Sequence, residues 1–246
     1  MKKGSTAPKF QKISQNEIIF LVRAYNESSR IAGVIDSLKK AGFSKILVVN
    51  DGSKDATLEI VSQYTSVHIV SHPYNRWGGA ALETGFEYIR RNHIELEVQY
   101  VVTFDADGQH NIADVENFMK AFERDPTLDI VFGSRFIVKT KSNVPWTRRI
   151  ILFGGMIFTW AISGIKLTDS HNGYRMIRVD RLRDLRLTMD GMEYASELIE
   201  LVHVHKLKFT EVPVNIHYDA YTLAKGQKHG GALRIVLRML WKKING

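Results

Sequence analysis

Apolar residues along the first half of the chain alternate between short runs and stretches with helical spacing. Residues 18–22 are a run of β-favouring residues that predicts a strand. The apolar positions that follow recur at i, i+3, i+4 and i+7, as in an amphipathic helix: Ile31, Val34, Ile35 and Leu38. Ser28 or Ser29 is placed to cap this helix, and Gly42 to end it.

The same alternation continues through the first half. Further strands are predicted at residues 46–49, 67–70, 100–104 and 129–132, and further helices at residues 56–64, 78–91 and 112–122. Repeated β–α order indicates an α/β fold with a mainly parallel sheet and helices on both faces. Ligands of such sheets bind at the carboxyl ends of the strands, where Asp51, Asp105 and Asp107 are expected.

An uncharged segment of 16 residues, 150–165, dominates the middle of the second half. It is shorter than the about 20 apolar residues that a spanning helix needs. It is either a buried core helix or a segment lying in the membrane interface. The neighbouring Arg148, Arg149, Trp146 and Trp160 favour the interface.

The C-terminal residues 232–246 combine apolar and basic positions at helical spacing. The apolar stripe is Leu233, Val236, Leu237 and Leu240, and the basic positions are Arg234, Arg238 and Lys242. This pattern predicts a basic amphipathic helix on a membrane surface, with ordinary packing as the alternative. The expected organisation is a basic tail (1–16), one α/β domain (17–231) and this helix.

Composition indicates a globular protein, since 44% of the 246 residues are hydrophobic and 24% are charged. The absence of cysteine excludes disulfides and thiolate-bound zinc. No long apolar stretch follows the basic N-terminus, so no signal peptide is predicted and a cytoplasmic location is expected. The net charge of +8 comes from three blocks without acidic residues, 1–16, 133–168 and 221–246. Such basic blocks are suited to bind nucleic acid, an anionic membrane or a polyphosphate substrate. The alternative is that they form a solvated basic surface without a partner.

The stretch FDADGQH places two carboxylates, Asp105 and Asp107, just after the predicted strand 100–104. Two anions this close repel each other unless a positive charge lies between them. Mg²⁺ or Mn²⁺ suits such a pair, because these ions take one or two carboxylates and complete their coordination with water and substrate phosphates. A polar turn that ends a strand is the alternative.

Several ordered motifs give the chain a family resemblance: RAYNE, VVNDGSKDAT, NRWGGAALETG, FDADGQH, GSRF, DSHNGYRMI, GMEYASE and EVPV. The chain resembles family 2 glycosyltransferases, which have the GT-A (Rossmann-like) fold. It is most similar to the branch that contains dolichyl-phosphate mannose synthase and bacterial polyprenyl-phosphate sugar synthases. The resemblance implies a GT-A domain over residues 17–231.

The resemblance also implies roles for individual residues. The nucleotide of a UDP- or GDP-sugar would be bound by Tyr25, Glu27 and Asp51. The divalent metal would be bound by Asp105 and Asp107, with Gln109 as a further ligand. For Asp51, capping of the helix after Lys54 is the alternative.

Basic residues in the later motifs suit an anionic acceptor. The resemblance implies that Arg135 of GSRF lies near the acceptor and takes part in catalysis, and Arg149 and Arg175 are further acceptor-binding candidates. Lys225 and Lys228 lie in a glycine-containing loop that is suited to close over the diphosphate, although a solvated basic loop is the alternative.

The implied reaction is inverting hexosyl transfer to polyprenyl phosphate, whose oxygen is already anionic near neutral pH and needs no general base. The alternative acceptor is a hydroxyl of a lipid-linked glycan, which needs a base, with Glu193 and Glu197 as candidates or as structural residues. A noncatalytic nucleic-acid-binding module is the alternative from another class. It is disfavoured because the basic blocks coincide with apolar amphipathic segments, so no nucleic-acid partner is expected. The enzyme is expected at the cytoplasmic face of the membrane, held there by its amphipathic stretches or by a membrane protein.

Three positions depart from the family pattern. Arg23 stands where proline is common, and Trp77 where glycine is common. Asn50 precedes Asp51 where the family often has two acidic residues, so the contact with the base is assigned to Asp51 alone.

Overall fold

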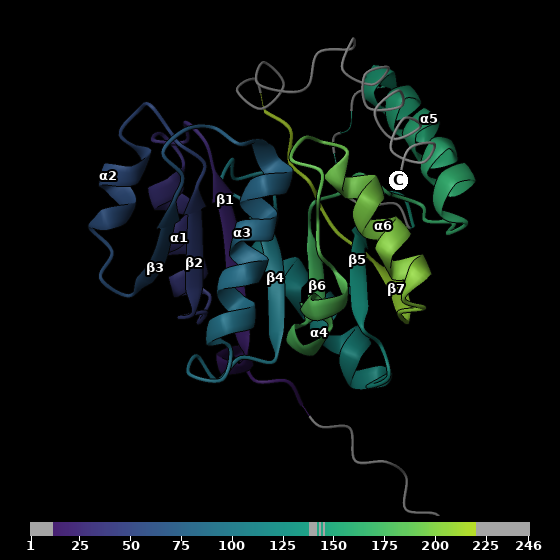
Figure 1. Ribbon diagram of the computed structural model, residues 1–246, viewed down its shortest axis with the longest axis horizontal. Helices are drawn as coiled ribbons and strands as arrows, with labels where there is room; N and C mark the ends of the chain where they lie inside the picture. Colours follow the sequence, from purple (N-terminus) through teal and green to yellow (C-terminus); the bar gives the residue numbers. More distant parts are fainter. Residues whose placement is uncertain (1–11, 138–141, 143, 145, 220–246) are drawn as a thin grey trace, which may run out of the picture.

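A seven-stranded sheet forms the centre of the molecule (Figure 1). The computed structural model describes residues 12–137, 142, 144 and 146–219. The strands are β1 (Ile18–Ala24), β2 (Ile46–Asn50), β3 (Val67–Ser71), β4 (Tyr100–Asp105), β5 (Ile130–Ser134), β6 (Arg175–Arg178) and β7 (Phe209–Pro213). Their order is β3-β2-β1-β4-β6-β5-β7. Only β6 runs antiparallel to its neighbours β4 and β5, so the predicted mainly parallel sheet is confirmed.

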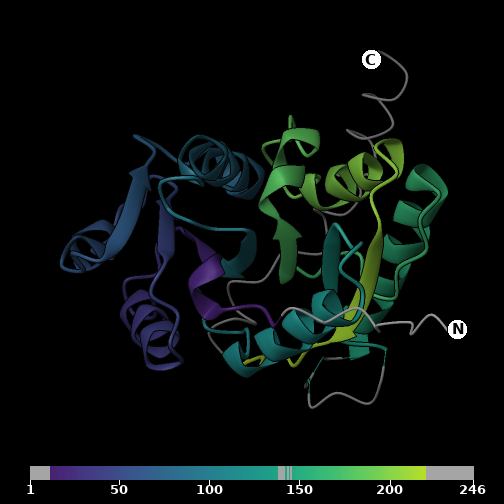
Figure 2. The same ribbon diagram turned by 90° about the horizontal axis from the view of Figure 1, so that it is seen from below.

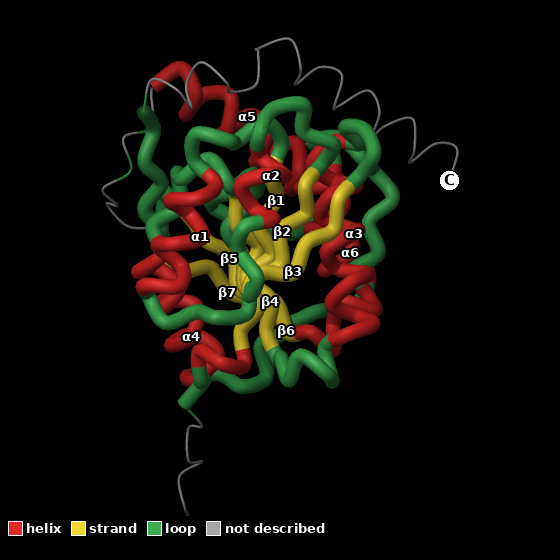
Figure 3. Tube along the Cα trace, turned by 90° about the vertical axis from the view of Figure 1, so that its left-hand side faces the viewer, coloured by secondary structure: helices red, strands yellow, loops and turns green. Residues whose placement is uncertain are grey.

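Helices cover both faces of the sheet, as Figures 2 and 3 show. The helices are α1 (Ile31–Lys40), α2 (Thr57–Ser62), α3 (Trp77–Asn92), α4 (Val115–Arg124), α5 (Trp146–Ser163) and α6 (Tyr194–Val204). Short 3-10 helices are η1 (Gln15–Glu17), η2 (Ile112–Asp114) and η3 (Val179–Asp184). Helices α1, α2 and α4 share one hydrophobic core with the sheet, and α3 and α6 share the other.

The two cores follow from the period of two in a strand. In β1, Phe20 and Val22 belong to the core under α1 and α4, whereas Ile19 and Leu21 belong to the core under α3 and α6. All four side chains are fully buried. A strand covered on both faces must be apolar at successive positions, which explains the continuous runs in the sequence.

Helix α1 differs from the sequence prediction at its start and agrees with it at its end. Helix α1 begins after Arg30, and neither Ser28 nor Ser29 supplies a side-chain cap; the N–H of Ser28 instead donates to Asp55 Oδ2 at 3.1 Å. Gly42 ends the helix as predicted, with a φ of 91° that glycine adopts without strain.

Helix α5 packs against α6 but leaves an apolar stripe uncovered. The exposed side chains of the stripe are Ile150, Phe153, Ile157 and Trp160, at 62%, 60%, 46% and 51%. The alternative of a fully buried core helix is therefore wrong for this face. Within the part of the chain that the structure describes, no helix has the length and apolar character needed to traverse a bilayer. Most of the N-terminal tail and the predicted helix at 232–246 lie outside the described residues.

Candidate active site

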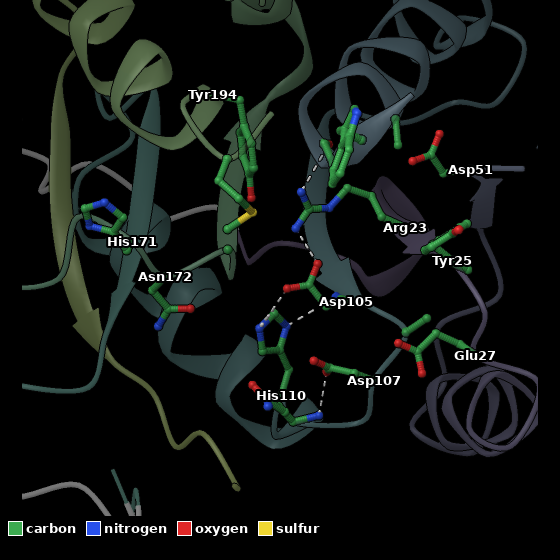
Figure 4. Close-up of a pocket in the computed structure, with 18 of the residues that line it drawn as sticks. Arg23, Tyr25, Glu27, Asp51, Asp105, Asp107, His110, His171, Asn172 and Tyr194 are labelled. Carbon is green, nitrogen blue, oxygen red and sulfur yellow. Dashed lines mark hydrogen bonds and ion pairs between the residues drawn. The ribbon is translucent and has the colours of Figure 1, made fainter. Parts of the chain in front are cut away.

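A cavity of about 390 Å³ opens at the carboxyl ends of β1, β2 and β4, where the parallel strands direct their following loops (Figure 4). It brings together most of the site residues predicted from the sequence: Tyr25, Glu27, Asp51, Asp105, Asp107, Gln109 and Arg135. Lys225 and Lys228 lie outside the described residues. Residues from both halves of the chain therefore form one site.

Asp51 follows β2 and is held at one end of the cavity by two contacts. His72 Nδ1 lies 2.7 Å from Asp51 Oδ1, and the N–H of Arg76 donates to the same oxygen at 2.8 Å. Asp51 does not cap α2, which begins after Ala56, so the capping alternative is wrong. Its carboxylate is thus oriented by the loop after β3 and lines the cavity.

His72 is a residue of the site that motif reasoning missed. It lies at 8% exposure, and its second ring nitrogen, Nε2, lies 2.9 Å from Thr84 Oγ1 of α3. The signal in the sequence is its position two residues after the predicted strand 67–70, at the same sheet edge as Asp51. His72 connects Asp51 to α3.

Asp105 ends β4 and forms an ion pair with Arg23 of β1. Arg23 also donates to the carbonyl oxygen of Gly78 at 3.3 Å and lies 5.0 Å from the ring centroid of Tyr194. Burial alone would raise the pKa of Asp105, but the Arg23 charge holds that pKa below its usual value. Burial likewise opposes the charge of Arg23, but Asp105 keeps the pKa of Arg23 above its usual value.

Asp107 has a different environment from Asp105. Burial, followed by the nearby charge of Asp105, raises the pKa of Asp107 to about 7. Its Oδ1 accepts a hydrogen bond from the N–H of Gln109 at 3.0 Å. Burial and the Asp105 charge both disfavour the ionised form of Asp107, and a bound cation would stabilise that form.

The described residues contain no group of three or more histidine, cysteine, aspartate or glutamate side chains that is arranged to hold a metal. The two carboxylates that line the cavity, Asp105 and Asp107, therefore suit an ion that needs few protein ligands. Mg²⁺ and Mn²⁺ fit, because substrate phosphates and water supply the remaining oxygens.

His110 supports the turn that carries both carboxylates. Its ring stacks on Tyr174 with centroids 4.7 Å apart and planes at 3°. Its Nδ1 accepts a hydrogen bond from the N–H of Asp105 at 3.5 Å. Burial lowers the pKa of His110 to about 4, so the ring is neutral near pH 7 and acts as a hydrogen-bond acceptor rather than a charge.

Arg135 lines the cavity, and its guanidinium is paired with the carboxylate of Asp169. Its Nε and Nη2 donate to the two carboxylate oxygens of Asp169, each at 2.6 Å, and Nη1 donates to the hydroxyl of Tyr218. Burial opposes the charge, yet Asp169 keeps the pKa of Arg135 above its usual value. Arg135 therefore presents a fixed and largely neutralised cation to the cavity.

Two other arginines predicted near the acceptor lie outside the cavity lining. Arg175 is fully buried on β6, beside the rings of Phe132 and Tyr194, and its guanidinium has no hydrogen-bond partner among the described residues. Arg149 is exposed on α5. Neither placement supports direct contact with a ligand in the cavity.

The two glutamates considered as a general base are buried and do not line the cavity. Glu197 accepts hydrogen bonds from the N–H and hydroxyl of Thr188, at 3.1 and 2.6 Å, and from the N–H of Met189 at 2.9 Å. Glu197 therefore holds the loop before α6, and Glu193 lies at the start of the same helix.

Trp77, which stands where glycine is common in the family, has a backbone conformation that is unusual for a residue other than glycine. Its φ is 73°, in the left-handed region that favours glycine. Its side chain is 66% exposed and lines the cavity together with Met192. The departure from the family pattern therefore adds an exposed indole to the cavity lining, at a position whose φ glycine would adopt without strain.

Comparison with known proteins agrees with this architecture. A protein of unknown function from Methanocaldococcus jannaschii is 34% identical, over 99% of this chain and 98% of its own. The UDP-N-acetylglucosamine–dolichyl-phosphate N-acetylglucosaminyltransferase of Methanococcus voltae is 29% identical, over 92% and 96%. Glucosyl-3-phosphoglycerate synthase from Mycobacterium tuberculosis, solved with Mn²⁺ and UDP-glucose, has a TM-score of 0.66 at 15% identity, covering 91% of this chain and 76% of that one.

The solved structure shows that the fold is GT-A. The model of the family described as glycosyl transferase family 2 matches residues 20–186, which include most of β1, all of β2 to β6 and both carboxylates of FDADGQH. The chain therefore belongs to the family 2 glycosyltransferases and is a hexosyltransferase.

Proposed function

We propose that the protein transfers a sugar from a UDP- or GDP-sugar to polyprenyl phosphate, with inversion at the anomeric carbon. The observation that carries this proposal is that one cavity is lined by Asp51, by the carboxylates Asp105 and Asp107, and by Arg135. The relative from Methanococcus voltae is named for transfer to dolichyl phosphate, and it matches 92% of this chain. This similarity supports a polyprenyl phosphate as the acceptor.

The nucleoside would bind at the end of the cavity that Asp51 forms. A carboxylate there accepts hydrogen bonds from the imide N–H of uracil or from the N1–H and amino group of guanine. Tyr25 and Glu27, from the loop after β1, line the same end. Because His72 and Arg76 fix the orientation of Asp51, little conformational entropy is lost when the base binds.

The diphosphate would bind beside Asp105 and Asp107, where Asp107 and Gln109 are suited to hold Mg²⁺ or Mn²⁺. The ion would neutralise the negative charge of the leaving diphosphate. A solved GT-A neighbour contains Mn²⁺ together with UDP-glucose, which supports a divalent ion here. Lys225 and Lys228 remain proposed as residues that close over the diphosphate.

The acceptor would bind near Arg135. An oxygen of the lipid phosphate forms a bond to the anomeric carbon while the bond from that carbon to the nucleoside diphosphate breaks. The phosphate oxygen is already ionised near pH 7, so no base is required. The placement of Glu193 and Glu197 outside the cavity lining favours this acceptor over a glycan hydroxyl, which needs a base.

The exposed stripe of α5 would place the enzyme on the membrane that contains the lipid acceptor. Large apolar side chains on one helix face, with Arg149 also exposed, suit an anionic membrane interface. The predicted helix at 232–246 would add a second contact, or a membrane protein would recruit the enzyme. The active location would then be the cytoplasmic face of the membrane.

The test is a transfer assay with radiolabelled UDP-glucose, UDP-N-acetylglucosamine and GDP-mannose, each with undecaprenyl phosphate and Mn²⁺. Label in the lipid extract from one donor, lost with Asp107→Asn, supports the proposal. Transfer to a lipid-linked glycan but not to bare undecaprenyl phosphate would replace it with the hydroxyl-acceptor alternative. No transfer from any donor to either acceptor would overturn it.

A further inference from the structure

Arg23 and Asp105 are register partners in the parallel pair of β1 and β4. Their side chains meet at the carboxyl ends of these two strands, inside the cavity (Figure 4). The pair is substantially shielded from water, with 12% of the Arg23 side chain and 32% of the Asp105 side chain exposed. Because both residues belong to the central sheet, the backbone fixes this charge pair in place.

Three partners from different elements hold the Arg23 guanidinium. They are the Asp105 carboxylate of β4, the carbonyl oxygen of Gly78 at the start of α3, and the ring of Tyr194 at the start of α6. Moving Arg23 away would leave Asp105 and the guanidinium without their charge partners at a buried position, which is costly. Asp105 is therefore already neutralised by the protein.

Asp107 lacks such a partner. Among the described residues, no lysine or arginine forms an ion pair with it, and its carboxylate accepts a hydrogen bond from the neutral N–H of Gln109. A divalent cation chelated by both carboxylates would lie against the guanidinium that already occupies Asp105, and like charges repel at that range. The same cation on Asp107 alone meets an uncompensated negative charge.

We propose that Arg23 divides the two carboxylates between different tasks. It retains Asp105 as a structural ion pair and leaves Asp107, with Gln109 and the substrate phosphates, to bind the divalent ion. Arg23 is thus a positioning residue for the metal site. This inference rests on the proposed nucleotide-sugar function.

Two isosteric variants test the division of tasks, with Mn²⁺ as the probe in the presence of UDP or GDP. Free Mn²⁺ is measured by its electron paramagnetic resonance signal for the wild type, Asp105→Asn and Asp107→Asn. Asp107→Asn should weaken Mn²⁺ binding by more than about 100-fold, and Asp105→Asn by less than about tenfold, the lower end of the range for residues that do not ligate the metal directly. An equal loss in the two variants, or a larger loss in Asp105→Asn, would overturn the proposal, as would no binding by the wild type.

A third variant tests Arg23 itself. Arg23→Gln removes the charge but keeps an amide donor near Asp105, so Mn²⁺ affinity should rise as Asp105 becomes available. Arg90→Gln, which disturbs ion pairs of α3 outside the cavity, is the matched control and should leave Mn²⁺ binding unchanged. Unchanged or weaker binding in a folded Arg23→Gln protein contradicts the proposal. If Arg23→Gln does not fold, the Mn²⁺ affinities of Asp105→Asn and Asp107→Asn still test the proposal.

The transfer assay separates the failure of this inference from the failure of the proposed function. Normal wild-type transfer with equal losses of Mn²⁺ affinity in the two asparagine variants overturns only the division of tasks. Absence of wild-type transfer with intact Mn²⁺ binding overturns only the proposed reaction.

Discussion

His72 Nδ1 lies 2.7 Å from Asp51 Oδ1; both side chains are buried, and Asp51 lines the cavity. This contact leads to the first prediction. His72→Ala should weaken binding of the nucleoside diphosphate about tenfold, since a hydrogen bond to a charged group contributes about 1.5 kcal/mol. Isothermal titration with UDP and GDP measures the effect. His72→Asn, which offers an amide N–H near the position of Nδ1, should restore most of the affinity, whereas a purely steric role for the ring predicts no rescue.

The bidentate pair of Arg135 and Asp169 predicts a large effect on stability. Arg135→Lys keeps the charge but loses the paired geometry, so the free energy of unfolding should fall by about 3 kcal/mol. Urea denaturation measures it. Lys120→Gln, which removes an exposed i,i+4 pair with Glu116 on α4, serves as the control and should not shift the midpoint. Similar midpoints for the two variants would show that the buried pair does not stabilise the fold.

The raised pKa of Asp107 predicts how the stability of the metal-free protein depends on pH. Burial and the Asp105 charge raise this pKa to about 7, whereas an unfolded aspartate has a pKa of about 3.9. The native state therefore binds the proton more tightly, and its contribution to stability is lost as the pH rises from about 4 to about 7. Thermal melts across this range in chelator should show a decline that Asp107→Asn lacks. Parallel curves for the two proteins would contradict the assignment.

The left-handed backbone at Trp77 predicts an order of stability between two variants. Both Trp77→Gly and Trp77→Ala remove the exposed indole, but only glycine adopts a φ of 73° without strain. Trp77→Gly should therefore be more stable than Trp77→Ala by about 1 kcal/mol. Chemical denaturation of the two variants side by side measures the difference. A more stable alanine variant would mean that this loop changes conformation when the indole is removed.

The uncovered stripe of α5 predicts membrane binding that depends on single side chains. Phe153→Asp should weaken binding to phosphatidylcholine–phosphatidylglycerol vesicles by more than about tenfold, because inserting a large apolar side chain contributes about 2 kcal/mol. Vesicle flotation measures it. Ile94→Asp changes an equally apolar residue, 81% exposed in the loop after α3, and should bind like the wild type. Equal losses in both variants, or none in Phe153→Asp, would exclude α5 as the contact.

The strands and helices of the first half were predictable because their signals are local. Strand β1 lies over the predicted run 18–22, and α1 follows the predicted apolar spacing. The short β6 and β7 are not evident from the apolar pattern beyond residue 132, because β6 has four residues and an arginine at each end. Their pairing depends on neighbouring strands that are distant in the sequence.

The chemistry of the site was predictable in its residue types but not in its pairings. The apolar pattern alone places Asp51, Asp105 and Asp107 at the ends of strands, and in a parallel sheet such residues gather at one edge. The pairing of Arg23 with Asp105, the orientation of Asp51 by His72 and the burial of Arg175 outside the cavity lining became visible only in the folded protein. This difference arises because strand character depends on neighbours along the chain. A charge partner instead depends on strand order and register, which are set by packing between distant segments.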